Sequence, residues 1–343
     1  MRLARPAALL ILGSGLLLAA CSGAGSAGSP ATSAAPTTAA SAAPATSSEP
    51  SASAGASASA GASGQASAAS SGGAAAALSV TAKEYAFDVA TSVPAGVTAI
   101  TLNNAGKETH QAQLVKLNAG KTMADLQAAL QNPDPSAGLK LVTLAGGPNA
   151  LPPGSSGTTT ANLEPGSYAF LCFVSSADGI PHVAKGMVAP LEVTGTAANT
   201  QLPSGDASLT LKDFSFDLNQ LSAGKHTVTV KNDGPQSHEA TIVKLNDGVT
   251  VDTLRTMFTS SQPSASPAAS GGAASPAASG SGGPASGPPW TEVGGITGIA
   301  PGTTATMDVD LPAGNYAFIC FIPDATTGKP HAALGMIGAL TVQ

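Results

Sequence analysis

The chain has 343 residues, of which 40 are glycine and 26 are proline, and its formal net charge at pH 7 is −6. Only 10% of the residues are charged and no basic patch is visible, so we expect no nucleic-acid partner. Residues 22–77 are almost entirely Ala, Ser, Gly, Thr and Pro, and a similar stretch covers about 260–289. Because these segments offer no large side chains to bury, we predict that they are disordered linkers.

The first 21 residues have the features of an export signal. Arg2 and Arg5 provide positive charge, an apolar run begins at about Ala7, and small residues precede Cys21. We interpret residues 1–21 as a signal peptide with no mature membrane-spanning helix behind it. The Leu-Ala-Ala-Cys sequence resembles a bacterial lipobox, which implies that Cys21 is lipidated and anchors the protein to the cell membrane outside the cytoplasm. The alternative is an ordinary signal peptide cut nearby.

The rest of the chain contains one sequence unit twice. Three pairs of segments align: 101–120 with 229–248, 163–173 with 311–321, and 181–193 with 330–342. Self-similarity of this kind indicates a duplicated structural unit. We therefore place a first domain at 78–195 and a second at 206–343, and we call these residues the first and second copy. The biased stretch at about 260–289 is an insert in the second copy.

Short strands are predicted throughout each copy. In the first copy, β-forming residues bounded by Gly, Pro, Asn or Asp occupy 78–87, 97–102, 110–115, 158–163, 168–174 and 188–193. One short helix is expected after the third strand, because Thr122 and Asp125 have the spacing of a capping box, and 251–258 is its counterpart. This pattern predicts an all-β chain of two tandem β-sandwiches with Greek-key connections.

Each copy carries four candidate metal ligands in the same order: a histidine, a cysteine, and a second histidine with a methionine five positions after it. They are His110, Cys172, His182 and Met187 in the first copy, and His238, Cys320, His331 and Met336 in the second. Two imidazoles, a thiolate and a thioether suit a soft, redox-active metal, and copper above all. We therefore expect one copper ion per domain.

Side-chain alternation directs these ligands inward. Residues two apart in a strand point the same way, so His110 shares the face of Ala112 and Leu114, and Cys172 shares the face of Phe170. The polar residues that alternate with the inward series are expected to face solvent. They are Gln111 and Gln113 in the first copy and Glu239 and Thr241 in the second.

These motifs resemble a known family. PGSYAFLC and AGNYAFIC, each followed by H-x4-M, are similar to the Pro-Gly-x-Tyr-x-Phe-x-Cys...His-x4-Met ending of plastocyanin-type cupredoxins. NNAGKETH and KNDGPQSH look like the turn ahead of the first copper histidine in that family. The resemblance covers both domains apart from the helix region and the insert. It implies a Greek-key cupredoxin sandwich, blue copper held by the eight residues above with methionine as the weak axial ligand, and one-electron transfer.

The loop between cysteine and second histidine departs from the family pattern. It has nine residues in the first copy and ten in the second, whereas familiar members have a much shorter one. Its DG and TTG segments are expected to form a small hairpin whose proline returns the histidine to the site. Two functions stay open: a membrane-anchored copper protein that transfers electrons to a redox partner or buffers copper, and a metal-free cupredoxin-fold surface module whose cysteines are merely buried.

The histidine content of the chain bears on whether it could be an enzyme. Oxidases and nitrite reductases built from cupredoxin domains need a further histidine cluster, typically His-x-His pairs, whereas this chain has 5 histidines and no such pair. No Ser-His-Asp, Cys-His or phosphate-cradling motif is visible either. We therefore predict that the chain is not an enzyme.

Overall fold

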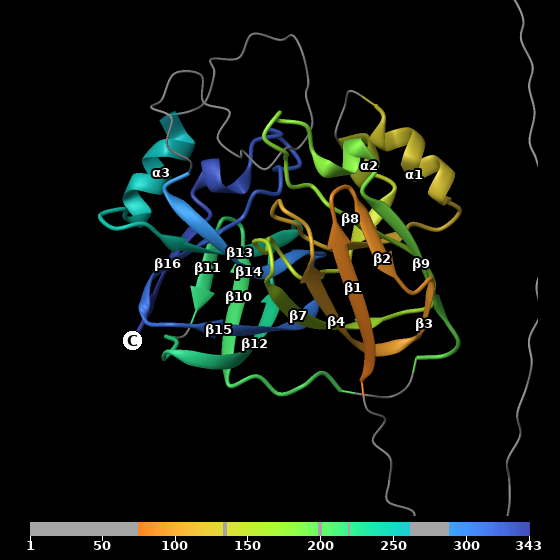
Figure 1. The fold of residues 1–343 in the computed structure, drawn as a ribbon, viewed down its shortest axis with the longest axis horizontal. Helices are drawn as coiled ribbons and strands as arrows, with labels where there is room; N and C mark the ends of the chain where they lie inside the picture. The colour runs from red at the N-terminus through yellow and green to blue at the C-terminus, as the bar shows by residue number, and fades with distance from the viewer. Residues whose placement is uncertain (1–74, 133–135, 198–200, 219, 261–287) are drawn as a thin grey trace, which may run out of the picture. The chain divides into compact units, whose positions relative to one another are not determined.

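The computed structural model describes most of both copies (Figure 1). The described residues are 75–132, 136–197, 201–218, 220–260 and 288–343. The predicted signal peptide, Cys21, nearly all of the predicted linker and most of the insert lie outside them. The described residues belong to one compact unit. Among the described helices, none has the length and apolar character to cross a membrane.

The described part of the first copy is mainly β-structure. Its strands are β1 (Ala76–Lys83), β2 (Ala86–Val89), β3 (Ser92–Pro94), β4 (Gly96–Asn104), β5 (Gln113–Leu117), β6 (Val142–Leu144), β7 (Ser156–Leu163), β8 (Gly166–Leu171) and β9 (Val188–Thr194). Its helices are α1 (Met123–Leu130), α2 (Ser136–Leu139) and the short 3-10 helix η1 (His182–Lys185). Helix α1 begins with the predicted capping box, since Thr122 Oγ1 accepts from Asp125 N at 3.2 Å and Asp125 Oδ2 accepts from Thr122 N at 2.8 Å.

The second copy follows the same order, except that its described residues contain no counterpart of strand β3 or helix α2. Its strands are β10 (Ala207–Lys212), β11 (Ser215–Leu218), β12 (Gly224–Asn232), β13 (His238–Leu245), β14 (Trp290–Ile299), β15 (Thr304–Leu311), β16 (Gly314–Ile319) and β17 (Ile337–Val342). Its helices are α3 (Val251–Ser260) and the 3-10 helix η2 (His331–Leu334). Helix α3 covers the predicted 251–258 segment.

Each copy packs two sheets on one apolar core. In the first copy, β2-β1-β4-β7 pack against β3-β9-β8-β5-β6, and in the second β11-β10-β12-β15 pack against β14-β13-β16-β17. Side chains from both sheets fill the core, such as Ile100 on β4 and Phe170 on β8, both 0% exposed. The chain passes from one sheet to the other between β4 and β5 and again between β7 and β8, as Greek-key sandwiches require. The predicted fold class is confirmed.

The two copies also share β-structure. Strands β7 and β15 pair antiparallel, with Thr159 opposite Met307, so the first sheets of the two copies form one eight-stranded sheet. On the other side, Gly146 N–H donates to the Gly298 carbonyl at 2.8 Å, and Thr297 N–H donates to the Gly147 carbonyl at 2.9 Å. Main-chain pairing therefore joins the copies at two places.

This contact corrects one expectation from strand alternation. The polar residues predicted to face solvent are nearly inaccessible, with exposed fractions of 6% for Gln111, 3% for Gln113, 7% for Glu239 and 2% for Thr241. Gln113 Nε2 donates to the Gly298 carbonyl at 3.0 Å. Alternation separates the two faces of a strand correctly, but it does not show that the other copy covers the outer face.

Candidate metal centres

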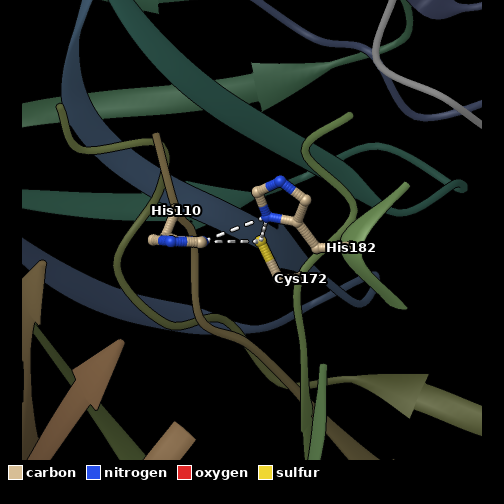
Figure 2. Close-up of side chains that lie close together, drawn as sticks. All are labelled: His110, Cys172 and His182. Carbon is tan, nitrogen blue, oxygen red and sulfur yellow. Dashed lines mark hydrogen bonds between the residues drawn. The ribbon is translucent and has the colours of Figure 1, made fainter. Parts of the chain in front are cut away.

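The three non-methionine ligands of the first copy converge on one point (Figure 2). His110 Nδ1 lies 3.0 Å from His182 Nδ1, and Cys172 Sγ lies 3.4 Å from His182 Nδ1 and 3.9 Å from His110 Nδ1. All three side chains are 0% exposed. The point equidistant from these three atoms lies about 2 Å from each, which is close to the length of a metal–nitrogen bond.

The second copy repeats the arrangement. His238 Nδ1 lies 3.1 Å from His331 Nδ1, and Cys320 Sγ lies 3.4 Å from His331 Nδ1. The ligand atoms of His238, Cys320 and His331 all lie within 4.8 Å of one another, and the three residues are buried. The structure therefore brings together six of the eight predicted ligands, as two buried His2Cys groups.

The long loop before the second histidine is held by its own hydrogen bonds. In the first copy Ser176 N–H donates to the Ile180 carbonyl at 3.0 Å, and Ser175 forms a bridge with Pro181. His182 N–H then donates to the Val174 carbonyl at 2.8 Å. The predicted hairpin is confirmed, and it places the histidine beside Cys172 in spite of the loop's length.

The second loop folds in the same way. Asp324 N–H donates to the Lys329 carbonyl at 2.8 Å, and Pro323 forms a bridge with Pro330. His331 N–H donates to the Ile322 carbonyl at 2.9 Å. Both loops therefore replace a short rigid connection with a closed turn.

The two methionines are fully buried and lie where the chain returns from the 3-10 helix. Met187 N–H donates to the His182 carbonyl at 2.9 Å, and its own carbonyl accepts from Cys172 N at 3.4 Å. Met336 makes the matching bonds to His331 at 2.9 Å and to Cys320 at 3.3 Å. The main chain thus fixes each methionine against two predicted ligands, and its role as axial ligand stays a prediction.

Cys172 and Cys320 are free thiols in the metal-free protein. They form no disulfide, and burial raises the pKa of Cys172 to about 12 and the pKa of Cys320 well above its ordinary value. Main-chain N–H groups point at the sulfurs, from Gln111 to Cys172 Sγ and from Glu239 to Cys320 Sγ, each at 3.5 Å. A metal ion would therefore have to displace the thiol proton when it binds.

The four histidines of the two groups are neutral at neutral pH. Burial, followed by the neighbouring imidazole, lowers the pKa of His110 to about 4 and does the same for His331. Burial also lowers the pKa of His182 and His238, although a carboxylate acts in the opposite direction at each. Neutral imidazoles offer a nitrogen lone pair, so both groups fit copper in the metal-free state.

Two carboxylates complete the surroundings of the centres. Glu108 Oε2 lies 2.7 Å from His182 Nε2, and Asp213 Oδ1 lies 2.5 Å from His238 Nε2. Neither carboxylate was predicted from the sequence. Glu108 stands two residues before His110, which is a usable signal, whereas Asp213 lies in the turn between β10 and β11 and has no local signal.

No protein-family model and no curated protein sequence matches the chain. Among solved structures, reduced auracyanin from Roseiflexus castenholzii is 24% identical, over 36% of this chain and 100% of its own, with a TM-score of 0.25. A multicopper oxidase is 12% identical, over 78% of this chain and 88% of its own, with a TM-score of 0.21. Copper nitrite reductase from Nitrosomonas europaea is 15% identical, over 79% of this chain and 94% of its own, with a TM-score of 0.20.

These matches correct the prediction that the chain is not an enzyme. A multicopper oxidase and copper nitrite reductases are among the similar structures, so the enzyme class is not excluded. The prediction was wrong because it counted histidines within one chain. Such a count excludes only a site built from those residues, whereas carboxylates or a second copy of the chain can also supply ligands.

The overall likeness to the solved structures is loose, so the assignment rests on the chain's own geometry. Each copy is a two-sheet Greek-key sandwich with a buried His2Cys group and a buried methionine at one end. The ligand order is the same in both copies, and the strand order agrees apart from β3, which has no counterpart strand among the described residues of the second copy. The fold is cupredoxin-like and is present twice in tandem.

Proposed function

We propose that the protein binds one copper ion in each copy and transfers single electrons outside the cytoplasm. The observation that carries the proposal is the convergence of two Nδ1 atoms and one Sγ, which are buried and lie within 4.8 Å of one another, in both copies. Trigonal His2Cys coordination with a weak axial methionine is the donor set of blue-copper electron-transfer sites.

When bound, copper would supply one-electron exchange between its Cu(I) and Cu(II) states. The protein's residues already form the cage in the absence of the metal. The ligands are 0% exposed, so bulk water is kept from the metal position. The N–H groups of Gln111 and Glu239 donate to the sulfurs, and hydrogen bonding at the cysteine sulfur is one of the factors that tune the potential.

The cellular role follows from the N-terminal sequence and is part of the same proposal. A lipid on Cys21 would hold the protein at the outer side of the cell membrane, with the chain between Cys21 and strand β1 as a spacer. A redox partner protein would then meet the folded copies near that surface. Ile180 is 46% exposed and lies in the loop that delivers His182, so it offers an apolar contact point close to the first centre.

Copper loading tests the proposal. The purified protein, supplied with Cu(II), is expected to bind two copper ions per chain and to show the intense blue thiolate-to-copper band. Cys172→Ser and Cys320→Ser should each remove one copper ion and about half of the band while leaving the circular dichroism spectrum of the β-structure unchanged. A colourless protein that takes up no copper would refute the proposal and leave the metal-free surface module.

A further inference from the structure

In each centre one histidine has its Nε2, the nitrogen that points away from the cysteine, next to a carboxylate. It is the downstream histidine in the first copy and the upstream histidine in the second. In the first copy the downstream histidine is held, through His182 Nε2 and Glu108 Oε2 at 2.7 Å. In the second copy the upstream histidine is held, through His238 Nε2 and Asp213 Oδ1 at 2.5 Å. The other histidine of each pair has a buried Nε2 without a hydrogen-bond partner in the described structure.

Sequence differences between the two copies explain why a different histidine contacts the carboxylate in each centre. In the alignment that pairs the upstream histidines, Glu108 of the first copy stands opposite Gln236 of the second. Gln236 cannot act as a carboxylate, and its Nε2 instead donates to Asp213 Oδ2 at 3.1 Å. Glu84 stands opposite Asp213, at the same turn between the first two strands, but it accepts from Lys107 N.

Further hydrogen bonds support the contact in each copy. Glu108 Oε2 also accepts from Ser176 Oγ at 3.0 Å, so the loop that delivers His182 helps to hold its carboxylate. In the second copy Gln236 holds the free oxygen of Asp213. The two histidines are 0% exposed, whereas the side chains of Glu108 and Asp213 are 33% and 21% exposed. Each carboxylate therefore connects a buried ligand to the protein surface.

The chemical consequence concerns the tautomer of the histidine. A neutral imidazole carries one N–H, on either Nδ1 or Nε2. A carboxylate next to Nε2 can only accept a hydrogen bond, so it favours the tautomer with the proton on Nε2. The Nδ1 lone pair is then left free, and it points at the cysteine sulfur and the other Nδ1. A carboxylate behind a ligating histidine also raises its basicity, which favours the more highly charged metal ion.

We propose that Glu108 and Asp213 are positioning residues, each of which fixes the Nδ1-binding tautomer of one histidine and lowers the reduction potential of its own centre only. The part that concerns potential rests on the proposed copper binding. The part that concerns the tautomer does not, because it applies to the metal-free protein. The two centres are consequently not equivalent: charge is placed behind the downstream histidine in one and behind the upstream histidine in the other.

The tautomer is tested without metal. Imidazole nitrogen-15 shifts of the copper-free protein should show a proton on Nε2 of His182 and His238. Glu108→Ala should convert His182 alone to a mixture of tautomers, and Asp213→Ala should do so for His238 alone. If either histidine keeps a pure Nε2–H form in its alanine variant, the positioning role is overturned, whether or not the protein binds copper.

The potential is tested in copper-loaded protein with one centre intact. With Cys320→Ser present, Glu108→Gln should raise the potential of the first centre. With Cys172→Ser present, Asp213→Asn should raise that of the second. We expect about a tenfold change in the relative affinity for the two oxidation states, or about 59 mV for one electron. Glu164→Gln and Asp217→Asn remove an exposed carboxylate that faces a lysine and serve as controls.

The outcomes separate the two proposals. A rise confined to the centre next to the substituted carboxylate, absent from the controls, supports the inference. Potentials that match the controls would overturn it while leaving copper binding intact. Failure of all variants and of the parent protein to bind copper would overturn the proposed function, and the nitrogen-15 result would still decide the tautomer.

Discussion

The metal-free protein should lose stability in mild acid because of its buried histidines. Burial lowers the pKa of His110 and of His331 from the ordinary value of 6.5 to about 4 in the folded protein. Between these values the unfolded chain binds more protons, so the free energy of unfolding falls as pH falls from about 6.5 to about 4. At pH 4.5 the free energy of unfolding is lower than at pH 7 by about 2.5 kcal/mol for each histidine, or about 5 kcal/mol for both.

The assay is urea denaturation of copper-free protein at pH 7 and pH 4.5, for the natural chain and for His110→Gln with His331→Gln. Comparison with the variant removes contributions from other groups. Glu239 makes such a contribution, because burial raises its pKa to about 7. A carboxyl with a raised pKa in the folded protein increases the free energy of unfolding as pH falls, which is opposite to the effect of the histidines. If the natural chain and the variant lose the same free energy between the two pH values, the histidines are not buried as described.

Three further outcomes are expected. Copper binding at pH 7 in weak buffer should release about one proton per centre, because the pKa of the Cys172 thiol is about 12 and that of Cys320 is also raised; uptake without proton release would contradict the buried thiols. Gly147→Ala should destabilise the protein by more than about 3 kcal/mol in thermal denaturation, since its φ is +122° and a Cβ would lie 2.0 Å from the Ala112 carbonyl oxygen. Gly154→Ala should cost only about 1–2 kcal/mol, because its φ is +76° but nothing lies within 4 Å, and equal losses in the two variants would refute the close approach.

The sequence predicted the inner surface of each copy well. Alternation of side chains in the strands placed His110 and Cys172 toward one interior, and the structure has their ligand atoms 3.9 Å apart. The capping box at Thr122 and the hairpin before His182 were also predicted, because each depends on residues close together in the chain. Local geometry is what such patterns encode.

The outer surface of each copy was not predicted. Glu239 was expected in solvent, but it is buried where the copies meet, and its Oε1 accepts from Phe321 N at 2.8 Å. Asn149 of the first copy donates to Thr241 Oγ1 of the second at 2.8 Å. These contacts join residues far apart in the chain, so no local periodicity reports them. The carboxylate of Asp213 at His238 was missed for the same reason.

X-ray absorption at the copper edge tests the central claim most directly. Protein loaded with two copper ions per chain should show two nitrogen ligands at about 2.0 Å and one short sulfur ligand for each copper. Cys172→Ser should bind half as much copper, and the copper that remains should keep its sulfur ligand. Copper surrounded only by nitrogen and oxygen would contradict the account, because the metal would then be bound outside the two His2Cys groups.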